Sequence, residues 1–283
     1  MREPEEDERE LLLDGWDEAA KGWGRQADSV RAAAMPVSSW LVERVAPRAG
    51  QTLLELAAGP GDTGFLAASA LAPGGTLICS DAVQAMLEVA RERAAEQGVA
   101  NVEFKQLQLE WIDLPTASVD AIIVKWGVML VLDPEAAVRE CRRVLRPGGR
   151  LALAVWDAPE RNPWTTIPQR ALRELGHIDA PPPGAPGMFA LAAPGRLGEL
   201  LEDGGFFDVE VMPVEMPRSY ANLNAWLGET VDLSRPFRGV WNALGDQQRA
   251  ALRARIGELA REFTDASGAL VLPAVSLAAS AGA

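Results

Sequence analysis

Short apolar runs alternate with segments of helical period through the first half of this 283-residue chain. The nearly unbroken apolar run at 120–126 is typical of a parallel strand that is covered on both faces. Strands that alternate with helices predict a parallel, doubly wound α/β sheet. The pattern predicts strands at 52–57, 76–80, 102–107, 120–126 and 150–156, and helices at 63–71, 83–98 and 133–145.

The pattern changes on both sides of this block. We expect residues 14–46 to be helical, with Pro36 starting a helix, because proline is favoured at the first helical position. The acidic residues 1–10 are expected to form a frayed, solvated tail. Segment 157–195 is rich in Pro and Gly with one short helical piece, which is typical of a lid or binding loop.

The C-terminal third is predicted to complete the sheet and to add more helix. Residues 196–205 and 221–263 have helical patterns, and strands are expected at 207–214 and 269–279. Pro273 suits an edge strand or a bulge, because proline cannot donate to a strand ladder. We therefore expect one domain with a helical cover.

The stretch LLELAAGPGDTG at 53–64 joins a predicted strand to a predicted helix through a glycine-rich turn. Glycines let the backbone approach a ligand closely, and the free amides at a helix start favour polar ligand groups. Gly59, Gly61 and Gly64 fit the dinucleotide fingerprint G-x-G-x-x-G. Asp81 follows Gly59 by 22 residues, near the spacing expected of a ribose-binding carboxylate. NAD would satisfy this pattern.

Glu55 favours a different cofactor. It lies inside the first strand, just before the loop, where a nicotinamide cofactor needs no acid. S-adenosylmethionine carries an ammonium and a sulfonium, so a carboxylate at this place has a cationic partner. The acid therefore favours S-adenosylmethionine over NAD.

Four blocks in this order resemble the class I S-adenosylmethionine-dependent methyltransferases of the small-molecule type. LLELAAGPGDTG is similar to the family's first motif, (D/E)-x-G-x-G-x-G, and SDAVQAML (80–87) to its acid-tipped second strand. Residues 118–156 resemble the fourth strand, fourth helix and fifth strand, and GGFFDVEVMPV (204–214) resembles the start of the final antiparallel pair. The resemblance implies a Rossmann-like, mostly parallel seven-stranded sheet with an antiparallel last strand and a helical or irregular lid.

The resemblance also divides the chain by role. It implies a single methyltransferase domain over 1–283, with these parts: an N-terminal helical lid at 1–46, a cofactor-binding core at 51–156, substrate-covering insertions at 157–195 and 221–263, and a final strand pair at 204–214 and 269–279.

The same resemblance implies which residues hold S-adenosylmethionine and its product S-adenosylhomocysteine. Asp81 would accept both ribose hydroxyls, or would only cap the next helix. Glu55 would hold the methionine ammonium, and Trp126 would give a cation–π contact to the sulfonium or would pack against a helix. Met86 would pack on adenine or belong to the core. The predicted cofactor-binding residues are Glu55, Ala57, Gly59, Gly61, Asp81, Ala82, Met86, Gln108, Leu109, Glu110, Lys125 and Trp126.

Two positions depart from the family pattern. Ala57 stands where relatives have the first glycine of the loop. Gln108 aligns with an Asp that reads adenine in relatives; its carbonyl oxygen accepts a hydrogen bond but not a charge-assisted one. Glu110 is the alternative acceptor.

Aromatic residues suggest an apolar acceptor site, although core packing alone also explains them. Trp126, Trp156, Trp164 and Phe189 are the candidates for substrate contact. Methyl transfer is an in-line displacement that depends mainly on alignment and exclusion of water. A base is needed only for some acceptors, and the weak candidates for it are His177 and Tyr220. No catalytic triad or metal cluster is visible, so we predict no metal site.

Composition narrows the partners. A net charge of −13 and a pI near 4.7 argue against nucleic acid, whose phosphates would be repelled. No apolar run approaches the length of a membrane span, and the N-terminus lacks the regions of a signal peptide. Two cysteines in apolar surroundings, Cys79 and Cys141, suit reduced thiols and a cytoplasmic protein.

Three function classes remain. We favour a methyltransferase acting on a small, largely apolar acceptor. The alternatives are an NAD-dependent oxidoreductase that uses the same glycine loop, and a catalytically silent S-adenosylmethionine-binding partner protein. The sequence leaves the acceptor, its acceptor atom and the oligomeric state open.

Overall fold

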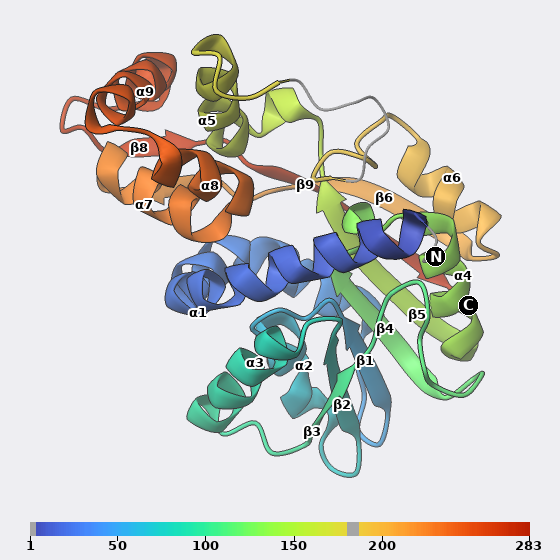
Figure 1. The fold of residues 1–283 in the computed structure, drawn as a ribbon. Coiled ribbons are helices and arrows are strands. Elements are labelled where there is room, and N and C mark those ends of the chain that lie inside the picture. The colour runs from blue at the N-terminus through green and yellow to red at the C-terminus, as the bar shows by residue number, and fades with distance from the viewer. Residues whose placement is uncertain (1–3, 180–186) are drawn as a thin grey trace.

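A seven-stranded sheet forms the centre of the computed structural model, which describes residues 4–179 and 187–283, with side chains from residue 11 onward (Figure 1). The strand order is β3-β2-β1-β4-β5-β9-β6, and β9 runs antiparallel to both of its neighbours. This confirms the doubly wound, mostly parallel fold. The strands are β1 Thr52–Leu56, β2 Thr76–Asp81, β3 Val102–Gln106, β4 Val119–Lys125, β5 Leu145–Trp156, β6 Phe207–Glu215 and β9 Val275–Gly282.

Helices cover both faces of the sheet. One face carries α2 and α3 with the long helix α1, and the other carries α4 and α6 (Figure 1). Asp133 caps α4, with its carboxylate accepting from the backbone N–H of Ala136 at 2.8 Å. The bounds are α2 Asp62–Leu71, α3 Gln84–Gln97, η1 Val128–Leu130, α4 Pro134–Val144 and α6 Arg196–Asp203.

Helix α1 corrects two expectations. It runs unbroken over Pro4–Val45, so the backbone of the predicted frayed tail is helical from Pro4, and Pro36 lies inside the helix rather than at the start of one. An internal proline removes one helical hydrogen bond. Burial of Ala34 and Val37, both 0 % exposed, stabilises the helix on both sides of that position. Among the described residues, no helix combines the length and apolarity that a bilayer crossing needs.

Two parts of the segments predicted as covers, residues 159–174 and 221–263, lie in a separate helical lobe (Figure 1), whereas Met188, Phe189 and Leu191 pack with the sheet core. The lobe has its own hydrophobic core around Trp226, which is 0 % exposed, and Trp164 packs against both this core and that of the sheet. Its elements are η2 Pro159–Arg161, α5 Pro163–Glu174, β7 Arg218–Tyr220, α7 Leu223–Leu233, α8 Arg235–Ala243, α9 Asp246–Leu259, η3 Arg261–Phe263 and β8 Leu270–Leu272.

The prediction of a single strand at 269–279 was wrong, because the structure has two strands there, separated at Pro273. β8, before the proline, pairs with β7 in a two-stranded sheet of the lobe. β9, after it, enters the main sheet between β5 and β6. Proline cannot donate to a ladder, so pairing changes where it occurs. The chain thus crosses from lobe to sheet at this residue.

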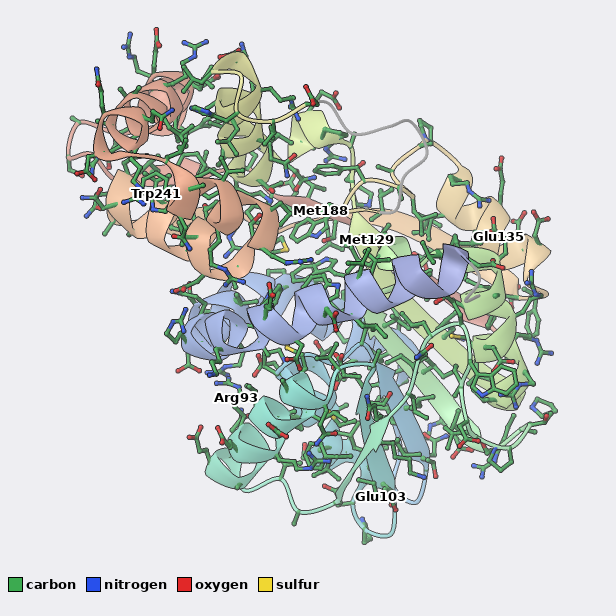
Figure 2. All side chains as sticks on the ribbon, in the orientation of Figure 1. Arg93, Glu103, Met129, Glu135, Met188 and Trp241 are labelled. Carbon is green, nitrogen blue, oxygen red and sulfur yellow. The ribbon has the colours of Figure 1, made fainter. Side chains whose placement is uncertain are left out.

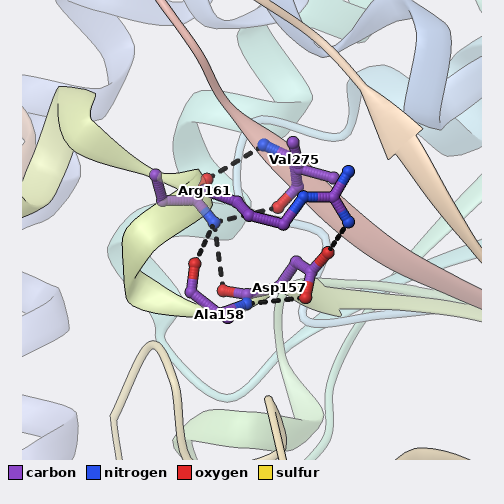
Figure 3. A network of polar contacts seen from close by, with 5 residues as sticks. Asp157, Ala158, Arg161 and Val275 are labelled. Carbon is purple, nitrogen blue, oxygen red and sulfur yellow. Dashed lines mark hydrogen bonds and ion pairs between the residues drawn. The ribbon is translucent and has the colours of Figure 1, made fainter. Parts of the chain in front are cut away.

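A buried amide joins the lobe to the sheet (Figure 3). Asn162, which is 0 % exposed, donates to the carbonyl oxygens of Asp157 and Val275 at 3.0 and 3.1 Å, and its Oδ1 accepts from the Val275 N–H at 3.0 Å. Asp157 in turn pairs with Arg161 and accepts from the Ala158 N–H at 2.7 Å. Because these buried polar groups satisfy one another, the ends of β5, β9 and α5 are held in fixed positions.

Candidate active site

A cavity opens at the carboxyl ends of β1, β2 and β4, where ligands bind in open α/β sheets. Every predicted cofactor residue except Glu55 and Gly61 lines it. The tertiary structure therefore gathers residues from four separate stretches of sequence at one place. The predicted residues in its lining are Ala57, Gly59, Asp81, Ala82, Met86, Gln108, Leu109, Glu110, Lys125 and Trp126.

The glycine loop has the left-handed backbone that its sequence predicts. Gly59 and Gly61 have φ of 53° and 84°, and Ala57 has φ of 49° although it carries a side chain. A Cβ at Gly127 would lie 2.6 Å from the Ala57 methyl. The methyl at position 57 thus takes space that only a glycine at position 127 leaves free.

Asp81 joins the loop to the second strand. It is 9 % exposed, and its two carboxylate oxygens accept from the backbone N–H groups of Gly59, at 2.8 Å, and Val83, at 3.0 Å. Burial raises its pKa, and these N–H groups oppose that rise. A carboxylate has about four lone-pair positions, so it retains acceptor capacity toward the cavity.

Glu55 lies beneath the loop, 2 % exposed, and its Oε2 has no hydrogen-bond partner among the described residues. Burial raises the pKa of this carboxyl to about 8, and the charge of Lys125 opposes the rise. A Cβ at Gly64 would lie 2.3 Å from Oε2, so the glycine lets α2 pack closely on Glu55. Lys125 donates to Ser38 Oγ on α1 at 3.3 Å, and burial lowers its pKa.

Trp126 lines the cavity next to Lys125. Its φ of 58° is unusual for a bulky residue, and such strain persists only where surrounding contacts impose it. The ring stacks on Trp156 at 4.4 Å with planes 17° apart, and its Nε1 donates to Ser276 Oγ at 2.9 Å. Trp164 packs on Trp156 at 5.0 Å. Trp156 and Trp164 therefore support Trp126 from behind and do not line the cavity.

The remaining candidates also lie off the cavity lining. Tyr220 is buried in the lobe, where its hydroxyl donates to Glu229 at 2.7 Å and burial raises its pKa. His177 follows α5, with its backbone N–H donating to the carbonyl of Leu172 at 2.9 Å. Phe189 packs on the sheet core next to Met188, and the preceding Gly187 donates its N–H to the carbonyl of Met129 at 3.2 Å (Met188 and Met129 are labelled in Figure 2). No described residue of the predicted insertions contributes to the lining.

Helix α1 and the segment after β4 supply walls that the motifs did not identify. The α1 residues follow a helical face, with Trp16, Trp23 and Val30 spaced seven apart, in the segment that the resemblance implied as an N-terminal helical lid. Trp16 and Trp23 pack beside Val83 and Met86 over the predicted adenine end. The additional apolar lining residues are Leu12, Leu13, Trp16, Trp23, Val30, Leu130, Val131 and Leu132.

The two candidates for reading adenine differ in their surroundings. Gln108 is exposed at the cavity, and only its backbone is engaged, as the carbonyl accepts from Trp111 N–H at 3.3 Å. The Glu110 carboxylate accepts from the N–H of Asp133 at 3.0 Å, before α4. Glu110 therefore also holds the loop that leads into α4.

Comparison with known proteins decides the family. The model of the ubiE/COQ5 methyltransferase family matches residues 38–165. Nocamycin O-methyltransferase from Saccharothrix syringae is 30% identical over 241 residues, which cover 81% of this chain and 83% of that protein. The chain belongs to the class I S-adenosylmethionine-dependent methyltransferases. It is an enzyme of this family, and its cofactor is S-adenosylmethionine.

One further sequence comparison and one structure comparison agree with this family and this fold. A ubiquinone/menaquinone biosynthesis C-methyltransferase from Hahella chejuensis is 34% identical over 119 residues, which cover 42% of this chain and only 48% of that protein. The crystal structure of the YcgJ protein from Bacillus subtilis has the same fold, with a TM-score of 0.57 and 22% identity, covering 87% of this chain and 97% of the other.

The residues of this methyltransferase fit its cofactor. A buried, unpartnered carboxylate oxygen at Glu55 suits a cationic group, and Asp81 suits paired hydroxyls at the cavity. The apolar residues Ala82, Val83 and Met86 suit the face of a purine. The donor set therefore matches an adenosine joined to an amino acid.

Proposed function

We propose that this methyltransferase moves the methyl group of S-adenosylmethionine to a small, largely apolar acceptor by in-line displacement. The observation that supports this proposal is a single cavity with two kinds of wall. Its polar side holds Asp81, Lys125 and the glycine loop, and its other side is formed by apolar residues of α1 and of 130–132. Such a lining selects by shape more than by charge.

The bound cofactor supplies an electrophilic methyl group on a sulfonium. The chain contributes alignment: the glycine loop and Asp81 fix one end of the cavity, while the stacked Trp126 fixes another. Helix α1 lines the cavity with Leu12, Leu13, Trp16, Trp23 and Val30, and in this proposal these apolar side chains exclude water from it. These contributions need no covalent enzyme intermediate.

Residue roles belong to the same proposal. Asp81 accepts the ribose hydroxyls, Glu55 takes the methionine ammonium, and Gln108 reads adenine. Trp126 presents a face to the sulfonium, supported by Trp156 and Trp164. The remaining cofactor contacts come from the loop backbone and from Ala57, Gly59, Gly61, Ala82, Met86, Leu109, Glu110 and Lys125.

The proposal assigns no general base. His177 and Tyr220 do not line the cavity, and Tyr220 is committed to Glu229. The acidic side chain Asp62 does line it, but it pairs with Arg93 at 2.8 Å. An acceptor that reacts without a strong base, such as an acidic enol, a carboxylic acid or a phenol, fits this setting best.

Relatives guide the choice of acceptor atom. One similar protein is named an O-methyltransferase and another a C-methyltransferase, so oxygen and activated carbon acceptors come first.

The proposal also includes a cytoplasmic location for the enzyme. The buried, free thiols of Cys79 and Cys141 accord with it.

Two measurements test the proposal. S-adenosylhomocysteine should raise the melting temperature, since a ligand that binds only the native state stabilises it, whereas NAD should not. Labelled S-adenosylmethionine is then offered with a panel of small apolar enols, acids, phenols and matched charged analogues. Stabilisation by NAD alone, or transfer only to the analogues that carry a charged group besides the acceptor group itself, would contradict it.

A further inference from the structure

Lys125 and Glu55 lie on the same face of the sheet at neighbouring strand ends. Glu55 of β1 pairs in register with Ile123 of β4. Because side chains alternate along a strand, Lys125 projects to the same face as Ile123, and therefore as Glu55. Helix α1 covers this face, and its Ser38 contacts the Lys125 ammonium at 3.3 Å.

The Lys125 ammonium has unused donor capacity. An ammonium carries three N–H donors, and its single hydrogen bond to a described side chain is the long one to Ser38. Ser38 in turn lies 3.0 Å from Thr63 Oγ1, so its hydroxyl is shared. Lys125 lines the cavity, with Nζ 5.2 Å from the ring centre of Trp126. Burial makes an ammonium with so few partners costly unless a ligand completes its contacts.

Glu55 is short of a partner in the same way. Its Oε2 is buried without a hydrogen bond, and no oxygen of its carboxylate lies within the 4.0 Å that would make an ion pair with Lys125. A buried carboxyl group and a lysine thus stand on one face, separated and each incompletely paired. A ligand end that carries both an ammonium and a carboxylate would complete the two together.

We propose that Lys125 binds the α-carboxylate of the cofactor's methionine end, so that Lys125 and Glu55 form one pair of charges that recognises an amino-acid zwitterion. This inference rests on the proposed function and goes beyond it by assigning each charged group of that end to one side chain. It also explains why an acidic protein of net charge −13 keeps a lysine beneath its cofactor cavity.

The test measures affinity by calorimetry for two ligands, S-adenosylhomocysteine and its analogue that lacks the α-carboxylate. The wild-type protein should prefer S-adenosylhomocysteine by roughly ten- to a hundredfold, the range for one hydrogen bond to a charged group. Lys125→Met should abolish that preference, because the substitution should lower the affinity for S-adenosylhomocysteine and not that for the analogue. Its affinity for the decarboxylated analogue should change by less than about threefold.

Lys105→Met is the matched control, because it removes the same charge from a lysine of β3 that is 40% exposed and paired with Glu103 at 3.7 Å. It should leave both affinities unchanged. Glu55→Gln should weaken S-adenosylhomocysteine but not the analogue that lacks the α-amino group. Circular dichroism and melting temperature establish that each variant is folded.

Different failures have different meanings. If the wild-type protein does not bind S-adenosylhomocysteine, the proposed function fails. If it binds both ligands equally, or if Lys125→Met weakens both equally, only the assignment of Lys125 is overturned. If Lys125→Met abolished methyl transfer but left both affinities intact, Lys125 would lie at the acceptor, and its assignment to the α-carboxylate would again be overturned. Should Lys125→Met not fold, the wild-type comparison and Lys125→Gln decide the question.

Discussion

The carboxylate of Asp81 accepts the backbone N–H of Gly59 at 2.8 Å, so one side chain connects the second strand to the glycine loop. The other carboxylate oxygen accepts from Val83 N–H at 3.0 Å, at the start of α3. Asp81 does not cap α3, whose N-cap residue is Val83 without a side-chain cap, and its carboxylate keeps acceptor capacity for the proposed ribose contact. One residue fixes the loop before any ligand arrives.

Asp81→Ala is expected to weaken S-adenosylhomocysteine binding by about 1.5–3 kcal/mol for each lost charge-assisted hydrogen bond. Asp81→Asn should be milder, because the amide oxygen still accepts. Titration calorimetry measures both, with the exposed Asp113→Ala as control. Unchanged affinity in a folded Asp81→Ala protein would refute the assignment.

Binding should depend on pH through Glu55, whose pKa burial raises to about 8. Only its carboxylate form pairs with an ammonium, so affinity for S-adenosylhomocysteine should rise between about pH 6 and about pH 8, by up to tenfold per unit, then level off. Calorimetry in buffers of different ionisation enthalpy should detect proton release on binding. Glu55→Gln should abolish this dependence, and a flat profile in the wild-type protein would contradict the role.

The same carboxyl should affect stability with a definite sign. Its folded pKa lies above the ordinary value of 4.5, so the unfolded chain loses the proton first as pH rises. The wild-type protein should therefore lose stability between about pH 4.5 and about pH 8 relative to Glu55→Gln. Urea unfolding of both proteins across that window measures the difference.

The methyl of Ala57 and the missing side chain of Gly127 should be energetically coupled. Gly127→Ala places a Cβ 2.6 Å from the Ala57 methyl and should destabilise by about 1–3 kcal/mol. Ala57→Gly relieves a left-handed residue, and in the double variant it should recover part of that loss. Gly228→Ala in α7, with open space around its Cβ, is the control. Additive effects in the cycle would contradict direct contact.

Adenine recognition should distinguish Gln108 from Glu110. Gln108→Ala is expected to weaken S-adenosylhomocysteine by about 1 kcal/mol, the scale of one neutral hydrogen bond, and Gln108→Asp should restore or improve binding. Glu110→Ala should mainly lower the free energy of unfolding, since it frees the Asp133 N–H. If Glu110→Ala alone weakens binding, Glu110 reads adenine instead.

The sequence by itself determined the sheet, the loop and the cofactor. A strand, a glycine turn and a helix are local sequence patterns. The positions of Gly59, Gly61 and Asp81 depend on the backbone conformation of the few residues around each of them. Local chemistry therefore predicted that side of the cavity. The family resemblance supplied the mostly parallel seven-stranded sheet with an antiparallel last strand, which the structure confirms, and the strand order came from the structure.

Only the tertiary structure decided how the two prolines affect helix and strand, and which distant residues pack together. Pro36 interrupts no helix because packing of α1 on the sheet outweighs its local preference, and Pro273 separates two strands because each finds a different partner. The stack of Trp126 on Trp156 joins residues 30 positions apart in the sequence, and Asn162 bonds across 113 positions to Val275. Such contacts arise from burial and from the satisfaction of buried polar groups after collapse, so no local pattern encodes them.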